Sequence, residues 1–355
     1  MKVALVYDRV NKWGGAERVL LSLNKIFPKA DLFTSVYNKE KAPWAKKFNI
    51  KTSFLQKIPG ASSRHEFLAT LMPIAFEGFN FENYDLVISV TSESAKGIIT
   101  KPKTLHICYC LTPTRYLWSG YNVYFKGRLF KLFSKPVVSY LRLWDKIASQ
   151  RPDYYIAISN EVKKRIKNYY GQNSSVIFPP LSISDVKPKL PAEQNYFLII
   201  SRLVAYKRID MAISVFNKLK LPLKIIGTGW EEGKLKRKAG SNIEFIKNLS
   251  EEELYGYYLN CRAFIFPTTE DFGLAMVEAQ YFGKPVIAYK AGGALDIVKE
   301  GKTGEFFGSE PELENVLENF KANRYNREAC IENSLRFSHK EFKKNLLDFI
   351  ERNKV

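Results

Sequence analysis

Short apolar runs alternate with stretches of helical periodicity along the sequence. At its start, the apolar run Val3–Tyr7 precedes a glycine turn at Gly14 and Gly15, and apolar residues then follow at helical spacing over 17–26. Such strand, turn and helix units build parallel sheets that are covered by helices. The same alternation predicts further strands in this half at 85–90, 104–110, 153–158 and 175–178, and a helix at 161–169 that Ser159 or Asn160 caps.

The pattern repeats after a segment at 182–194 that is rich in proline and charge, which we interpret as an interdomain linker. A chain of 355 residues favours two domains over one. The capping box formed by Ser338 and Glu341 predicts a final helix that ends near Arg352. The second half is expected to contain strands at 196–200, 223–226, 243–246, 263–266 and 285–288, and helices at 209–219, 251–260 and 274–282.

These elements predict an α/β fold with two Rossmann-like domains, each a doubly wound parallel sheet. The expected domains are 1–184, joined by the final helix at 338–355, and 185–337. Ligands bind such sheets at the carboxyl ends of their strands. We therefore expect the two domains to face a ligand-binding cleft.

One candidate site lies where a strand of the second half ends. The apolar run over 264–266 stops at Pro267, and a helix is expected to begin near Leu274. Amide groups at the start of a helix favour an anion, and Gly273 would let the backbone approach a phosphate closely. The segment therefore predicts an anion site such as one for a diphosphate.

Two carboxylates accompany this site. Glu278 shares a helix face with Leu274 and has apolar neighbours, so its charge needs a binding partner such as a pair of sugar hydroxyls. Glu270 precedes the helix and stands near the anion site. Taken in isolation, the two residues are better explained as a helix-capping acceptor and a solvated carboxylate.

In its full context, the segment at 267–287, with Glu270 and Glu278 eight residues apart, resembles the retaining glycosyltransferases of family four, which have the GT-B fold. The resemblance extends over nearly the whole chain and is nearest to bacterial and archaeal mannosyl- or glucosyltransferases of surface-polysaccharide assembly. Further matching segments are Gly14-Gly15-Ala16-Glu17, the basic segment 201–208, Ala291-Gly292-Gly293-Ala294 and Gly301-Lys302-Thr303-Gly304.

The resemblance implies a role for each matching position. Arg202 and Lys207 are expected to bind the donor diphosphate and to neutralise charge as the glycosidic bond breaks, which is usually the largest catalytic contribution. Glu278 is expected to hold the ribose hydroxyls. The remaining expected donor contacts come from Glu270 with the backbone of Phe272, Gly273 and Leu274, and from Gly14 and Gly15 of the first domain.

The sequence departs from the family at Leu111, where the family has a histidine near the donor sugar. The surrounding segment, 109–116, otherwise follows the family and supplies Arg115 as an acceptor-side candidate. Two interpretations stay open. The chain is an active enzyme, which we favour because retaining transfer in this fold depends mainly on the leaving diphosphate, or it is a weak or inactive subunit that binds sugar nucleotides at a membrane.

The implied donor is a GDP- or UDP-linked sugar, and the implied acceptor is a glycan or a lipid-linked glycan. The chain has no Asp-x-Asp pair and no Cys/His cluster with zinc spacing, so we expect no cofactor and no obligatory metal. A nicotinamide-dependent oxidoreductase is a rival interpretation. It is disfavoured because the glycine fingerprint that begins at Gly227 and Gly229 has its third glycine misplaced, at Gly233.

The net charge of +19 indicates an anionic partner. Basic and aromatic residues interleave over 115–151, which suits the headgroup region of an anionic membrane, although an ordinary helix with aromatics packed in the core is an equal alternative. No nucleic-acid motif accompanies the charge. With no apolar run of membrane-spanning length and a first strand in place of a signal peptide, we expect a cytoplasmic protein that is soluble or peripheral on the inner leaflet.

Overall fold

A computed structural model describes residues 1–63, 65–125, 127–183, 186–189 and 194–354. The chain forms two compact units, residues 1–180 with 342–355, and residues 181–341. The predicted domain boundary, between 184 and 185, lies outside the described residues, as do residues 190–193 of the predicted linker.

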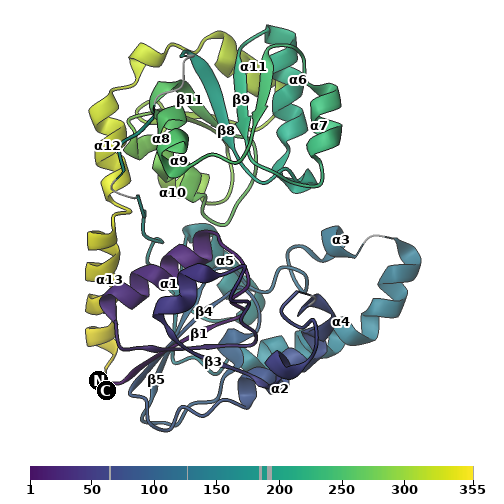
Figure 1. Ribbon diagram of the computed structural model, residues 1–355, viewed down its shortest axis with the longest axis vertical. Helices are drawn as coiled ribbons and strands as arrows, with labels where there is room; N and C mark the ends of the chain where they lie inside the picture. The colour runs from purple at the N-terminus through teal and green to yellow at the C-terminus, as the bar shows by residue number, and fades with distance from the viewer. Residues whose placement is uncertain (64, 126, 184–185, 190–193, 355) are drawn as a thin grey trace. The chain divides into compact units, whose positions relative to one another are not determined.

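The first unit contains a seven-stranded sheet in the order β3-β2-β1-β4-β5-β6-β7. Strands β1, β3, β4 and β5 of this sheet are labelled in Figure 1. Every pairing is parallel, so each connection between strands crosses the sheet and returns the chain to the end at which all strands begin. The strands are β1 Val3–Tyr7, β2 Asp31–Thr34, β3 Asn49–Thr52, β4 Leu86–Thr91, β5 Leu105–Cys110, β6 Tyr154–Ala157 and β7 Ser175–Val176.

Helices connect these strands. Ser159 caps α5, since its side chain accepts a hydrogen bond from the amide of Val162 at 3.1 Å. The helices are α1 Gly15–Ile26, α2 Met72–Glu77, α3 Tyr121–Tyr124, α4 Arg128–Ala148 and α5 Asn160–Tyr170, with 3-10 turns η1 Pro43–Lys47, η2 Phe54–Lys57, η3 His65–Leu71 and η4 Ala95–Gly97.

The last helix, α13 (His339–Asn353), joins the first unit from Phe342 onward. At its start, the Ser338 hydroxyl accepts from the amide of Glu341 at 3.3 Å, as the capping pattern predicts. Phe342 packs edge-to-face on Tyr109 of β5, with ring centres 5.9 Å apart. Aromatic packing on the sheet therefore attaches this helix to the first unit.

The second unit contains a six-stranded parallel sheet in the order β10-β9-β8-β11-β12-β13. The strands are β8 Tyr196–Ile200, β9 Leu223–Ile226, β10 Ile243–Ile246, β11 Cys261–Phe266, β12 Val286–Tyr289 and β13 Gly304–Phe307. The helices are α6 Ile209–Leu219, α7 Glu232–Lys238, α8 Glu251–Asn260, α9 Leu274–Tyr281, α10 Ala294–Ile297, α11 Glu310–Glu318 and α12 Arg327–Leu335, with 3-10 turns η5 Ala205–Lys207 and η6 Ala322–Arg324.

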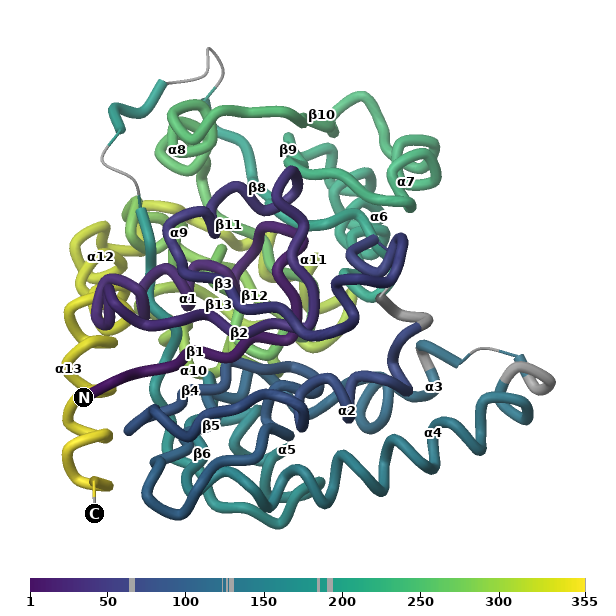
Figure 2. The backbone as a smooth tube through the Cα atoms, turned by 60° about the horizontal axis from the view of Figure 1, so that its bottom comes forward, coloured from purple at the N-terminus to yellow at the C-terminus, as the bar shows by residue number. Residues whose placement is uncertain are grey.

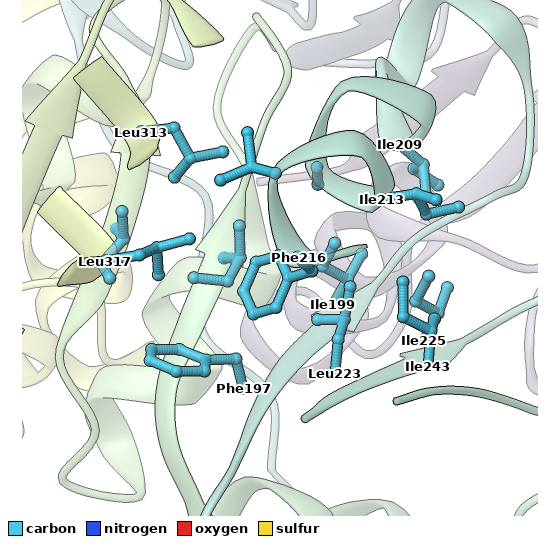
Figure 3. Close-up of a cluster of buried hydrophobic side chains, with 14 of the residues drawn as sticks. Phe197, Ile199, Ile209, Ile213, Phe216, Leu223, Ile225, Ile243, Leu313 and Leu317 are labelled. Carbon is cyan, nitrogen blue, oxygen red and sulfur yellow. The ribbon is translucent and has the colours of Figure 1, made fainter. Parts of the chain in front are cut away.

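Apolar side chains fill the space between this sheet and helices α6 and α11. Phe216 of α6 is fully buried, and Leu313 and Leu317 of α11 join it against Phe197 and Ile199 of β8 (Figure 3). Burial on this scale is the main favourable term in folding. The core holds the sheet rigidly, and it leaves the loops at the carboxyl ends of the strands to carry side chains for binding.

The prediction of two doubly wound parallel sheets is confirmed, with some differences in the elements. The strand expected at 175–178 is shorter, and ends at Val176. The elements that were not predicted include strands β2, β3 and β13 and helices α2, α3, α7, α10, α11 and α12. β3 is an edge strand with the sequence Asn-Ile-Lys-Thr, of which two residues are exposed, so it lacks the apolar run that marks a buried strand.

Candidate functional site

The second sheet changes winding direction between β8 and β11. β8 leads into β9 on one side and β11 leads into β12 on the other, although β8 and β11 are neighbours. The loops that leave such a pair diverge above the sheet, which makes the switch point the usual place for a ligand. These loops are 201–208, with Arg202 and Lys207, and 267–273, with Glu270.

Tyr206 links the charged residues of this switch point. Arg202 Nη2 donates to the Tyr206 hydroxyl at 2.5 Å, and the guanidinium carbon lies 6.0 Å from the ring centre. Lys207 Nζ lies 5.3 Å from the same ring centre and forms an ion pair with Glu270. The structure therefore brings Arg202 and Lys207 together at one aromatic ring and pairs Lys207 with Glu270.

Tyr206 is not among the predicted site residues, although it stands inside the matching segment between Arg202 and Lys207. Its backbone carbonyl accepts a hydrogen bond from Thr268 Oγ1 at 3.0 Å, and Thr268 is buried. This bond ties the loop after β8 to the loop after β11. The two basic residues are thus held close to the carboxylate by the backbone as well as by charge.

A left-handed glycine precedes the helix that follows the second loop. Gly273 has φ 102°, and a Cβ there would lie 2.5 Å from Met276 Cε and 3.0 Å from Phe266 Cζ. The glycine has no side chain with which to cap α9, so its first amides can serve an anion. Phe272 and Leu274 flank Gly273, and Phe272 is buried against Phe337 with ring centres 5.5 Å apart.

The loop before α9 is supported from behind by a second glycine turn. Gly293 donates its amide to the carbonyl of Glu270 at 2.9 Å, and a Cβ at Gly293 would lie 2.3 Å from the Cα of Phe272. Any side chain there would push the loop away. The turn Ala291-Gly292-Gly293-Ala294 therefore acts as a backing for the residues that the family resemblance assigns to the donor sugar.

Glu278 is buried on α9 and accepts a hydrogen bond from the Tyr258 hydroxyl of α8 at 2.7 Å. Tyr258 is itself fully buried and stacks on Phe282, with ring centres 5.5 Å apart. The prediction that this carboxylate needs a binding partner holds, but the protein supplies one. The burial of Glu278 therefore does not by itself require a sugar, and its role toward ribose stays a prediction.

The segment that begins at Gly227 is a turn after β9, as predicted, and it packs on the loop after β8. Leu203 donates its amide to Thr228 O at 2.9 Å, and its carbonyl accepts from the Glu231 amide at 3.0 Å. A Cβ at Gly229 would lie 2.2 Å from the same carbonyl oxygen. The spacing of these glycines therefore reflects contact between two backbones.

In the first unit, Gly14 and Gly15 form the start of α1. Two residues later, the buried Glu17 accepts a hydrogen bond from the Tyr7 hydroxyl at 2.6 Å. A Cβ at Gly14 would lie 3.1 Å from Glu17 Oε2. The turn is thus anchored to β1, and its contact with a phosphate stays a prediction.

The switch point of the first sheet lies between β1 and β4, and Asp8 occupies it. This buried carboxylate accepts the hydroxyl of Thr91 at 2.9 Å and the amides of 92–95 at distances of 2.8 to 3.1 Å. Next to it, Arg9 forms two hydrogen bonds to Glu93, at 2.6 and 2.8 Å. Sequence reasoning did not assign these residues, and the only signal is an acidic residue directly after the first strand.

Leu111 and Arg115 lie in the loop after β5, and both are half-buried. Leu111 donates its amide to Thr91 O at 2.8 Å, which places it at the same edge of the first sheet as Asp8. Gly14, Gly15 and Arg115 therefore belong to the first unit, and the other candidate residues belong to the second.

Within the described ranges, no group of three or more histidine, cysteine or acidic residues is arranged to hold a metal. All four cysteines are buried as free thiols. Among the helices described, none is both long and apolar enough to cross a bilayer.

Residues 183–337 match the family model for glycosyl transferases group 1. O-antigen chain mannosyltransferase C of Escherichia coli is 27% identical over 191 residues, which cover 49% of this chain and 50% of that protein. Alpha-1,3/1,6-mannosyltransferase ALG2 of Dictyostelium discoideum is 29% identical over 179 residues, 42% of this chain and 41% of that protein. The matches thus span about half the length of these curated relatives.

Solved structures match the whole chain. HepE of Anabaena, crystallised with UDP, has a TM-score of 0.73 at 16% identity and covers 99% of this chain and 100% of its own. Sucrose-phosphate synthase of Thermosynechococcus elongatus has a TM-score of 0.76 at 16% identity, with 99% of each chain covered. At this level of identity the likeness concerns the fold, and it identifies the fold as GT-B.

Proposed function

Because the chain carries a glycosyl transferases group 1 domain on a GT-B fold, we propose that it transfers a hexose of the mannose or glucose type from a nucleotide-diphosphate sugar to a glycan or lipid-linked acceptor. The observation that carries this proposal is the cluster of Arg202, Lys207 and Glu270 at the switch point of the second sheet. Support for the donor class comes from HepE, which was crystallised with UDP and with UDP-glucose.

The proposed chemistry depends on charge at the leaving group. As the bond between the sugar and the diphosphate breaks, negative charge grows on the diphosphate oxygens. Arg202 and Lys207 would bind these oxygens and stabilise that charge. The side chain of Lys207 is only 8% exposed, so little water would weaken its attraction to the diphosphate. The Glu270 partner of Lys207 would then be released to accept hydrogen bonds from the sugar hydroxyls.

We further propose retention at the anomeric carbon and no obligatory metal. Retention is implied by the family resemblance of the segment from Glu270 to Glu278. The proposal that no metal is needed rests on the lack of an Asp-x-Asp pair, since Arg202 and Lys207 would neutralise the diphosphate in its place. The nucleotide base and the acceptor are not defined by these residues. UDP- and GDP-linked donors therefore both belong in the test.

The test measures binding and turnover separately. Wild-type protein is heated with UDP or GDP, and release of UDP or GDP is followed from UDP-glucose and GDP-mannose with a panel of glycan acceptors. A nucleotide that binds only the folded state raises the melting temperature. Arg202→Ala and Lys207→Ala are each expected to lower turnover by about a hundredfold or more. Lys218→Ala, which removes an exposed ion pair with Glu314 in the same unit, is the matched control and should leave turnover unchanged.

The outcomes distinguish the two interpretations. Stabilisation by a nucleotide without any transfer or donor hydrolysis supports the alternative, a sugar-nucleotide-binding subunit with little or no activity. Absence of both stabilisation and turnover with every nucleotide rejects the proposal. Equal loss in Lys218→Ala and Arg202→Ala would show that charge in general, and not this site, matters.

A further inference from the structure

Helix α4 presents apolar side chains to solvent along most of its length. Their exposed fractions range from 43% at Val137 to 78% at Phe133. A helix turns about 100° per residue, which places all of them within about 140° of its circumference. We call this set the apolar stripe, and it comprises Leu132, Phe133, Val137, Tyr140, Leu143 and Ile147.

The opposite face of α4 attaches the helix to the first unit. Val138, Leu141 and Ala148 are buried, and Asp145 forms a buried ion pair with Lys96 of η4. Figure 2 shows α4 running along the outer edge of this unit. The buried face fixes the orientation of α4, so the apolar stripe on the other face points to solvent.

The structure also divides the basic aromatic segment at 115–151 into two parts. Tyr116, Trp118, Tyr121 and Phe125 pack around the buried Leu117, so for these the core-packing alternative holds. Lys126 and the side chains of Arg128 and Phe130 lie outside the described residues. Tyr124 of α3 is exposed, and the other exposed apolar residues described in this segment form the stripe, which contains two aromatic residues, Phe133 and Tyr140.

Charge decides which partner fits the stripe. Lys135 and Lys146 are exposed along one border of it. The only acidic residue of α4, Asp145, is buried and neutralised. An apolar face with a basic border and no exposed carboxylate matches an anionic lipid surface, into which such a helix sinks its apolar side chains. A second copy would bring the same lysines together, and like charges oppose that contact.

We propose that α4 lies on an anionic membrane surface and inserts its apolar stripe between the lipid headgroups. Only the purpose of docking, access to a lipid-linked acceptor at the membrane, rests on the proposed function. Docking itself needs neither donor nor turnover. Its failure and that of the proposed transfer are therefore measured independently.

The experiment is flotation of the full chain with phosphatidylcholine vesicles and with vesicles that also contain phosphatidylglycerol. Wild type is expected to float with the anionic vesicles and to detach as salt rises. Phe133→Ser with Leu143→Ser should lower the partition coefficient at least tenfold, and Lys135→Glu with Lys146→Glu should abolish the preference for anionic lipid. Leu295→Ser with Leu335→Ser, at positions 52% and 50% exposed in the second unit, is the matched control and should float as wild type does.

Three outcomes overturn the proposal. Wild type does not float with anionic vesicles, or the stripe variant floats as well as wild type. Alternatively, sedimentation without lipid shows a dimer that the stripe variant dissociates, which assigns the stripe to a second copy. Because the replaced side chains are exposed, thermal melting of all variants should match wild type, and a variant with a lowered melting temperature is replaced by Leu132→Ser with Ile147→Ser.

A second inference concerns Trp230, which is 73% exposed, more than any other large apolar side chain described in the second unit. It lies in the turn between β9 and α7. Its two neighbours are fixed to the Arg202 loop, since Gly229 touches the carbonyl oxygen of Leu203 and Glu231 donates its amide to it at 3.0 Å. The backbone of Trp230 is thus placed next to the loop that carries the proposed diphosphate contact, and its indole is exposed there.

We infer that Trp230 stacks on the base of the bound nucleotide, which rests on the proposed function. An exposed aromatic side chain on a turn that packs against the Arg202 loop suits a nucleotide, because the base and the phosphate would then be bound by separate groups. Stacking tolerates any base, since each has a π-face. Trp230 is therefore expected to stack on uracil and on guanine alike.

Calorimetric titration with UDP, GDP and inorganic pyrophosphate tests this directly. Trp230→Ala is expected to weaken UDP and GDP about tenfold and to leave pyrophosphate unchanged, whereas Trp230→Phe restores most of the affinity. Arg202→Ala should weaken all three ligands. The inference is overturned if Trp230→Ala binds UDP and GDP as wild type does, or if wild type binds them no more tightly than pyrophosphate. Equal binding of nucleotides and pyrophosphate would reject base stacking by Trp230, and the transfer assay would still test the proposed function separately.

Discussion

Lys96 and Asp145 form an ion pair inside the first unit, with 2.5 Å between Nζ and Oδ1 and 1% of each side chain exposed. The Thr114 hydroxyl and the Trp118 indole also donate to Asp145, at 2.8 and 2.7 Å. One buried carboxylate therefore joins η4, the loop after β5 and α4. The loop that carries Leu111 and the orientation of the apolar stripe depend on the same group.

Replacing this carboxylate is expected to destabilise the first unit strongly. Burial opposes the charge of Lys96, but the Asp145 carboxylate outweighs it and raises the pKa of the lysine. Asp145→Asn leaves the Lys96 ammonium without a counter-charge. The new amide group also places a donor where Trp118 or Thr114 needs an acceptor. The free energy of unfolding in urea should fall by about 3–5 kcal/mol.

The control for this variant is the exposed pair between Lys101 and Glu82, which has the same 2.5 Å separation but 52% exposure on both sides. Glu82→Gln should leave the unfolding curve unchanged, because solvent screens such pairs. Equal changes in the free energy of unfolding for the two variants would contradict the explanation that burial determines the contribution of the Asp145 ion pair.

Gly273→Ala is expected to disturb the loop before α9. A Cβ at φ 102° is strained and would lie 2.5 Å from Met276 Cε, so the loop must move or the methionine must repack. We expect a loss of about 1–3 kcal/mol in unfolding free energy and weaker nucleotide stabilisation. Gly233→Ala, in helix α7, is the control. A Cβ at Gly233 would have no atom nearer than 3.9 Å, so alanine there should raise the free energy of unfolding by up to about 1 kcal/mol. Loss of stability in both variants would contradict this explanation.

The sequence predicts elements best where local signals agree. Helices α6 and α8 begin and end at the predicted residues, and Ser250 forms a complete capping box with Glu253 at the start of α8. The edge strand β10 was predicted, but the edge strands β3 and β13 were missed because local signals are absent or conflict there. β13 begins at Gly304 inside a segment that looks like a turn, and its place is set by pairing with β12, which no local pattern encodes.

The candidate site divides in the same way. The segments around Lys207 and Glu270 could be found because motif residues lie close in sequence. Tyr206, Tyr258 and Asp8 act through contacts with distant elements, for example the 2.7 Å bond from Tyr258 to Glu278, twenty residues away. Such partners become visible only when the packing of α8 on α9 is known.

His106 on β5 should make stability depend on pH. It is fully buried beside Ser89, whose hydroxyl lies 2.9 Å from Nε2, and burial with a contribution from Arg151 lowers its pKa from 6.5 to about 3. Between these values the unfolded chain binds a proton that the folded chain does not. Stability therefore falls as pH drops below 6.5, by up to about 1.4 kcal/mol per pH unit from this residue.

Urea unfolding of wild type and His106→Gln at a series of pH values from 7 to 5 measures this contribution. The variant carries no titrating group at position 106, so its free energy of unfolding should decline less steeply with acid, whatever its stability at neutral pH. Parallel declines in the two proteins would show that His106 does not titrate differently in the folded and unfolded chains.

Leu111→His restores the residue that the resembling family has at this position. The side chain of Leu111 is half-buried at the end of β5, and its amide bond to Thr91 does not depend on the side chain. If the charge of the leaving diphosphate is stabilised by Arg202 and Lys207, transfer should proceed in both proteins, with kcat/KM within about tenfold. Leu105→His, at the other end of the same strand, controls for the general cost of histidine in β5. An inactive wild type that gains turnover only through Leu111→His would instead identify the natural chain as a binding subunit.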